Sequence, residues 1–176
     1  MTAASKVSVF FCCPLDSLGS AMATYAGQNL GAGKIDRIDN GLKAGSLLGI
    51  GYSIFALAVL YFFGASAVAL FVTNPSQELV SQAREFLLIN AAFYIALVFV
   101  NLVRFMIQGL GHAPLAILAG LMEMVARTIA GLVLVPLFGF TGACFASPLA
   151  WILADAFLFP AYFGIMKKIK SRFGLL

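Results

Sequence analysis

Charged residues are scarce in this sequence. Asp, Glu, Lys and Arg make up 10% of its 176 residues, compared with about a quarter of a typical soluble domain. Hydrophobic residues make up 62%, and the mean hydropathy is +1.01. This composition excludes an ordinary soluble domain and predicts an integral membrane protein. Because a membrane-crossing helix needs about 20 apolar residues, the chain has room for about five or six spans in one bundle.

Cysteine and histidine are also rare. The three cysteines, Cys12, Cys13 and Cys144, lie in apolar stretches without the CxxC spacing of a metal site, so neither a disulfide framework nor a structural metal is expected. The single histidine, His112, lies in a predicted turn, and no Ser/His or Asp/Asp pair indicates a catalytic site. We therefore expect neither an enzyme nor a bound cofactor.

What the sequence does contain is a series of apolar segments separated by short polar turns. A polytopic, all-α transmembrane bundle of about five spans is therefore the predicted fold. The predicted helical segments are residues 7–27, 43–72, 79–110, 114–137 and 143–166.

The basic residues are split into small groups at the ends of these segments, which indicates membrane topology and not a nucleic-acid partner. With five spans, the loop after the first segment and the C-terminus lie on the same side of the bilayer. Only Lys6 and Arg84 are expected on the other side. The richer side is therefore predicted to be cytoplasmic and the N-terminus external. Its seven cations are Lys34, Arg37, Lys43, Lys167, Lys168, Lys170 and Arg172.

A glycine-rich stretch joins the first two segments and contains Gly27, Gln28, Asn29, Gly31, Gly33, Lys34 and Arg37. A phosphate-binding P-loop is excluded, because Gln28 stands where its first glycine belongs and Ile35 follows the lysine. The glycines are instead predicted to end one helix before the next begins.

The same stretch, Gly27-Gln28-Asn29-Leu30-Gly31-Ala32-Gly33-Lys34 with Arg37, resembles the cytoplasmic loop signature of the multidrug and toxic compound extrusion (MATE) family. Residues 105–111, followed by Pro114, resemble the later intracellular turn of the same family. The family's fold is twelve helices in two lobes. The resemblance implies that residues 1–176 form the C-terminal lobe, helices eight to twelve, without its first helix.

The resemblance also implies a function for a longer parent protein that supplies the missing N-terminal lobe. That function is secondary antiport across the plasma membrane, exporting organic and often cationic xenobiotics in exchange for protons or sodium. One alternative is a related flippase for a lipid-linked precursor, for which this chain offers only Arg104 and Arg127 as phosphate-binding residues in its apolar segments. Another is that the chain alone is a non-functional fragment.

Five charged residues lie inside the apolar segments, where charges are costly and are expected to face the bundle or a water-filled cavity. Glu123 and Arg127 are four residues apart and are predicted to pair, either as a structural clasp or as part of ion coupling. The charges of all five sum to −1, so Asp16 or Asp155 is a candidate to take up a proton or a sodium ion. The fifth is Arg104.

A polar stripe is predicted on segment 79–110, at spacings that place its members on one helix face. It either lines a substrate path or hydrogen-bonds between helices. This segment carries no acid inside the membrane, so the family's coupling sites cannot be transferred to it and the coupling ion stays open. The stripe consists of Asn90, Tyr94, Asn101, Arg104 and Gln108.

Overall fold

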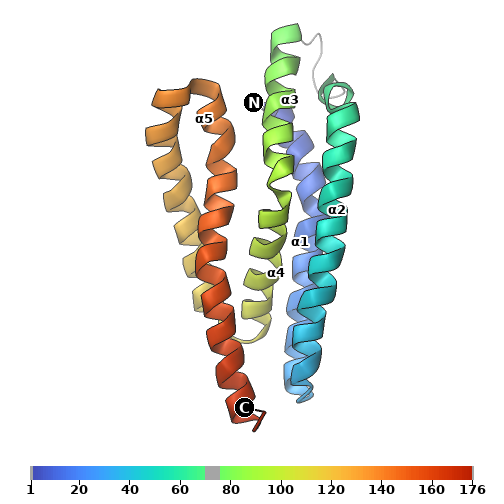
Figure 1. The fold of residues 1–176 in the computed structure, drawn as a ribbon, viewed down its shortest axis with the longest axis vertical. Helices are drawn as coiled ribbons and strands as arrows, with labels where there is room; N and C mark the ends of the chain where they lie inside the picture. Colours follow the sequence, from blue (N-terminus) through green and yellow to red (C-terminus); the bar gives the residue numbers. More distant parts are fainter. Residues whose placement is uncertain (1, 70–75, 176) are drawn as a thin grey trace.

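The computed structural model describes residues 2–69 and 76–175, and within these ranges every regular element is a helix. The helices form one elongated bundle with the N-terminus at one end and the C-terminus at the other (Figure 1). The predicted all-α transmembrane bundle is therefore confirmed. Its elements are α1 (Thr2–Gly31), α2 (Ile35–Ala69), α3 (Gln77–Ala92), α4 (Tyr94–Gly109) and α5 (Ala113–Arg172).

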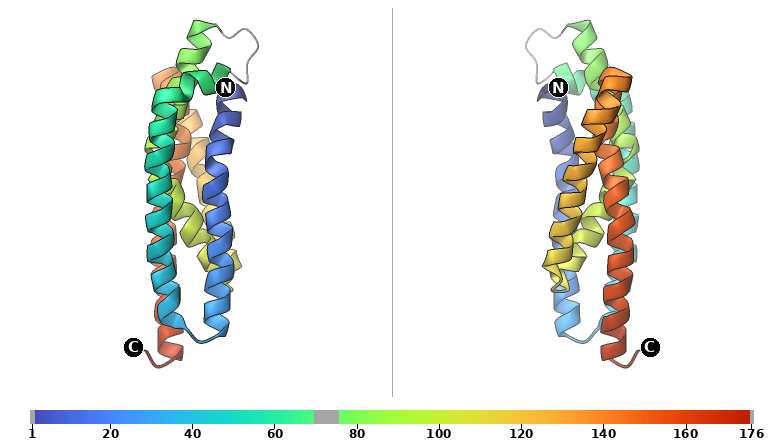
Figure 2. Two further views of the ribbon diagram at one scale, coloured as in Figure 1. Left: turned by 90° about the vertical axis from the view of Figure 1, so that its right-hand side faces the viewer. Right: turned by 90° about the vertical axis from the view of Figure 1, so that its left-hand side faces the viewer.

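The helix α5 contains 60 residues but folds back on itself at Gly139, whose φ of 57° and ψ of −131° are not helical. Its two legs lie side by side and run in opposite directions (Figures 1 and 2). The backbone is so close at this turn that a Cβ atom on Gly142 would overlap the carbonyl of Leu134. The two legs correspond to the predicted segments 114–137 and 143–166.

The prediction of a single helix over residues 79–110 is wrong, because the helix is broken at Phe93 into α3 and α4. Their axes differ by 52°. Phe93 has φ of −102° and ψ of 9°, and its N–H turns back to the carbonyl of Asn90 at 3.0 Å. Neither glycine nor proline stands within residues 77–108, so the sequence carries none of the usual signals of a helix break.

The start of α3 is capped by Ser76, whose Oγ accepts a hydrogen bond from the Leu79 N–H at 3.3 Å. The helix α2 ends at Ala69. Residues 70–72, which were predicted to belong to the same helical segment, lie outside the described ranges. The helix α2 begins at Ile35, eight residues before the predicted start at residue 43.

Within the described residues, α1, α2 and α5 are long and apolar enough to cross a membrane, and the bent pair α3–α4 is a fourth when the two helices are counted as one span. Because α5 doubles back, its two legs bring the bundle to the predicted five membrane-length segments. The core lies around α4, which packs against α1, α2 and α5. Large apolar side chains such as Leu47, Ile54 and Phe62 of α2 point outward, as expected for surfaces in contact with lipid.

Candidate functional site: an intramembrane charge cluster

The glycine-rich stretch ends α1 as predicted. Gly33 has a left-handed φ of 69°, and its N–H bonds to the carbonyl of Leu30 at 3.0 Å while the Lys34 N–H bonds to that of Asn29 at 2.9 Å. This pair of bonds is the Schellman motif, which needs glycine at the left-handed position. The Asn29 side chain donates to the carbonyl of Tyr25 at 2.8 Å. These backbone N–H groups are used within the turn, so they are not free to cradle a phosphate.

The two stretches that carry the family resemblance meet in space, since α1 crosses α4 at their glycines. A Cβ atom on Gly27 would lie 3.1 Å from the carbonyl oxygen of Gly109, and one on Gly109 would overlap the carbonyl of Ala23. Glycine is therefore required for this close helix contact. The remaining members of the signature, Gln28, Gly31, Gly33, Lys34 and Arg37, are exposed at the same end of the bundle.

The predicted pair of Glu123 and Arg127 is present on the first leg of α5, with Nη2 of Arg127 2.9 Å from Oε2 of Glu123. Arg104 of α4 joins the same carboxylate through Oε1. The Glu123 side chain is only 8% exposed, whereas those of Arg104 and Arg127 are 22% and 44% exposed. A buried acid is thus held between two guanidinium groups, and one of these ion pairs connects two helices.

The other two intramembrane acids lie around Arg104. Asp16 of α1 accepts a hydrogen bond from Nδ2 of Asn101 at 2.7 Å, and it is close enough to Arg104 for their charges to interact. Asp155, on the second leg of α5, also interacts with the charge of Arg104. Its Oδ1 is buried and has no hydrogen-bond partner among the described residues. The five predicted intramembrane charges therefore form one charge cluster, in which Glu123 is ion-paired with Arg104 and Arg127, and the charges of Asp16 and Asp155 act on Arg104.

The members of the predicted polar stripe differ in their burial. Asn90 is buried and donates to the carbonyls of Phe86 at 2.8 Å and Cys144 at 3.5 Å. Tyr94 is also buried, and its hydroxyl lies 3.5 Å from Oγ of Ser8. Gln108 is exposed. Hydrogen bonding between helices therefore describes Asn90, Tyr94 and Asn101 better than a shared substrate path.

A polar surface on α1 adds Ser20 and Thr24 to the predicted site residue Asp16. Asp16, Ser20 and Thr24 are exposed, and their spacing of four residues places them on one helix face. A polar helix face is not stable against lipid tails, so it belongs against a water-filled passage or another part of the protein. The four-residue spacing was visible in the sequence, but the sequence did not show that this face is left open by the rest of the bundle.

Comparison with known proteins agrees with this fold. A family model described as MatE matches residues 1–137. Among solved structures, the chain is similar to one titled as the inward-facing conformation of a multidrug resistance MATE family transporter of the MOP superfamily. The TM-score is 0.80 at 19% sequence identity, and the match covers 94% of this chain but 42% of the other. A search of curated proteins gave no match. The chain belongs to the MATE family of membrane transporters.

Proposed function

We propose that this chain works as most of the C-terminal lobe of an antiporter that exports organic cations in exchange for protons or sodium ions. The observation that carries the proposal is the charge cluster, in which Arg104 lies among Glu123, Asp16 and Asp155 on three different segments of the bundle. An N-terminal lobe, supplied by a longer parent protein at the plasma membrane, would face the open polar surface of α1.

The cluster offers a way to couple an ion to a movement of helices. The charges of three acids act on Arg104, and within the described residues the one that forms an ion pair with it is Glu123. A proton or sodium ion arriving at Asp155 or Asp16 weakens the attraction of that acid for Arg104, and its release restores that attraction. Since these acids lie on different helices, the change shifts the balance between two arrangements of the bundle.

The charge of the cluster favours cationic substrates. Its five ionisable side chains sum to −1 when all are charged, and the exposed acid Asp16 lies on the open polar face of α1. An acidic wall raises the local concentration of cations in a passage.

The alternative of a flippase for a lipid-linked precursor is less well supported by this geometry. Arg104 and Arg127 are both paired with Glu123, so neither has a free guanidinium with which to hold the phosphates of such a substrate. The alternative of an inactive fragment concerns this chain without its N-terminal lobe, and it is tested by the same experiment.

The experiment is ethidium efflux from bacterial cells that lack their own multidrug pumps and express the parent protein or residues 1–176 alone. We expect efflux from the parent protein, and we expect it to stop either when the proton gradient is collapsed or when sodium is removed. The ion whose removal stops efflux is the coupling ion. Efflux by the parent protein no faster than in cells with an empty vector, or unaffected by both treatments, would contradict antiport.

A further inference from the structure

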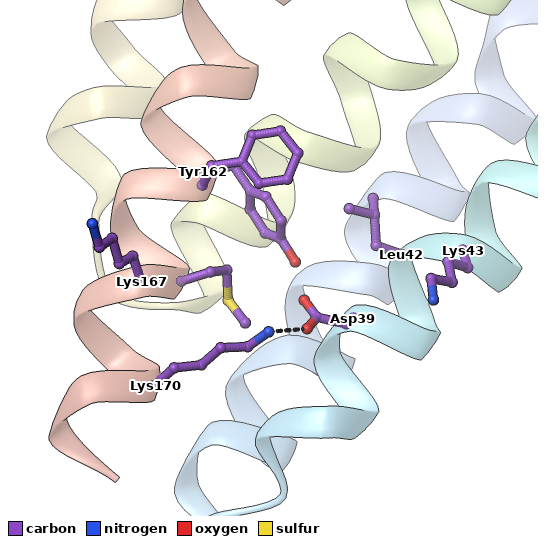
Figure 3. A pocket seen from close by; sticks show the side chains of 8 residues that line it. Asp39, Leu42, Lys43, Tyr162, Lys167 and Lys170 are labelled. Atoms are coloured by element: carbon purple, nitrogen blue, oxygen red, sulfur yellow. Dashed lines mark hydrogen bonds and ion pairs between the residues drawn. The ribbon is translucent and has the colours of Figure 1, made fainter. Parts of the chain in front are cut away.

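A second polar site lies at the end of the bundle that carries most of the basic residues. Here the first turns of α2 face the last turns of α5 across a pocket of about 510 Å³, a size within the usual range of ligand pockets. Figure 3 shows Tyr162 and Lys170 of α5 pointing toward Asp39 of α2, while Lys43 and Lys167 lie at the outer edges of the two helices. This pocket contains none of the residues of the charge cluster.

The pocket is positively charged. Nζ of Lys170 lies 2.6 Å from Oδ2 of Asp39, so this acid neutralises that lysine and ties α5 to α2 at the base of the pocket (Figure 3). Lys43 and Lys167 stand on opposite sides, and within the described part of the chain neither forms an ion pair. The three lysines and one aspartate leave a net charge of +2. A ligand that fits these charges is anionic.

The basic surface continues past this pocket toward the C-terminus. An adjoining pocket of about 610 Å³ shares Lys167 and is otherwise lined by Lys168, Ser171 and Arg172. Clusters of basic residues at the end of membrane helices attract anionic lipids of the cytoplasmic leaflet.

The other walls of the pocket are apolar. Leu42 and Met166 line it, and Phe163 is 63% exposed one helical turn before Lys167, on the side nearer the middle of the membrane. A soluble anion would leave these apolar surfaces without a partner. A phospholipid matches both the basic residues and the apolar walls of the pocket, because its phosphate is negatively charged and its acyl chains run from the phosphate toward the membrane interior.

We propose that this pocket binds an anionic phospholipid, with the phosphate attracted by the positive charges of Lys43 and Lys167 at the two edges of the pocket and an acyl chain along Phe163. The lipid would join α2 to the second leg of α5 at the surface of the bilayer, next to the ion pair of Lys170 with Asp39. This site depends on the bundle spanning a membrane, and it does not depend on the proposed substrate or coupling ion.

The test is native mass spectrometry of the purified protein after equilibration with equal amounts of phosphatidylglycerol and phosphatidylcholine. We expect retained phosphatidylglycerol to exceed phosphatidylcholine. The double variant Lys43→Gln/Lys167→Gln should lower this preference by about 25-fold, because each lysine beside an anionic headgroup contributes about fivefold. The variant Phe163→Ser should reduce the total amount of lipid retained.

The matched control is Lys34→Gln/Arg37→Gln, which removes the same charge from the same end of the bundle but outside the pocket. All four side chains are exposed, so both double variants should fold, as a thermal unfolding scan would check. The control should keep the preference for phosphatidylglycerol. An equal loss in both double variants, no preference in the unmodified protein, or displacement of the lipid by inorganic phosphate would each overturn the proposal.

Discussion

At the residue scale, Glu123 makes contacts of two kinds. Its bond to Arg127 lies within one helix, whereas its bond to Arg104 connects α5 to α4. The pair within the helix was predicted, because residues four apart on a helix are neighbours. The contact with Arg104 could not be predicted in this way, since spacing along one helix does not say which side chains of another helix come near it.

This difference predicts unequal effects of removing the two arginines. Arg104→Gln should destabilise the protein by about 3 kcal/mol, because it leaves a buried carboxylate with its interhelical partner missing. Arg127→Gln should cost less than about 1 kcal/mol, because Arg127 is the more exposed partner and solvent screens its charge. Thermal unfolding of the two variants in detergent measures both effects. Equal losses of stability would show that the contact between helices is not the stronger one.

At the element scale, the chain shows which features of a helix can be predicted from sequence. The turn between the legs of α5 was predicted, because Gly139 and Gly142 interrupt an apolar run and the backbone there requires glycine. The break at Phe93 was not predicted, because residues 77–108 contain no glycine or proline to indicate it. The break also separates Asn90, on α3, from the other members of the polar stripe, which all lie on α4.

The contact between α1 and α4 gives a prediction at this scale. Gly109→Ala should lower stability by about 1–3 kcal/mol, because the new methyl group would overlap the backbone of Ala23 and push the helices apart. Gly120→Ala is the matched control, since a Cβ atom at Gly120 meets nothing within 4 Å. The control should be neutral or slightly stabilising, because alanine favours helix more than glycine. A denaturation series on both variants tests this, and similar curves would mean that the crossing tolerates a wider separation.

At the scale of the whole molecule, the predicted topology agrees with the arrangement of the ends. The turn after α1 and the C-terminus lie at one end of the bundle, and the N-terminus lies at the other (Figures 1 and 2). The fold class was predictable because hydropathy and short turns determine the number of spans. The positions of the open polar face of α1 and of the charge cluster were not, because both depend on how the helices pack.

This arrangement predicts which cysteines a membrane-impermeant maleimide reaches from outside the cell. In a background with Cys12, Cys13 and Cys144 replaced by alanine, Lys6→Cys and Glu78→Cys should be labelled, whereas Lys34→Cys and Lys168→Cys should be protected until the cells are opened. The reason is that Lys34 and Lys168 lie at the end of the bundle with the excess of basic residues, and an end rich in basic residues stays in the cytoplasm. Labelling of the second pair in intact cells would reverse the orientation.

The most direct test of the charge cluster as a coupling site is gradient-driven ethidium efflux by the parent transporter carrying Glu123→Gln. The matched control is Glu78→Gln, which removes an exposed acid from the start of α3, at the end of the bundle where the N-terminus lies. At equal expression, we predict that Glu123→Gln slows the gradient-dependent rate at least about tenfold, equivalent to about 1.4 kcal/mol in the barrier, while Glu78→Gln leaves it unchanged. Gradient-dependent efflux by Glu123→Gln at the rate of the unmodified protein would contradict a coupling role for the cluster.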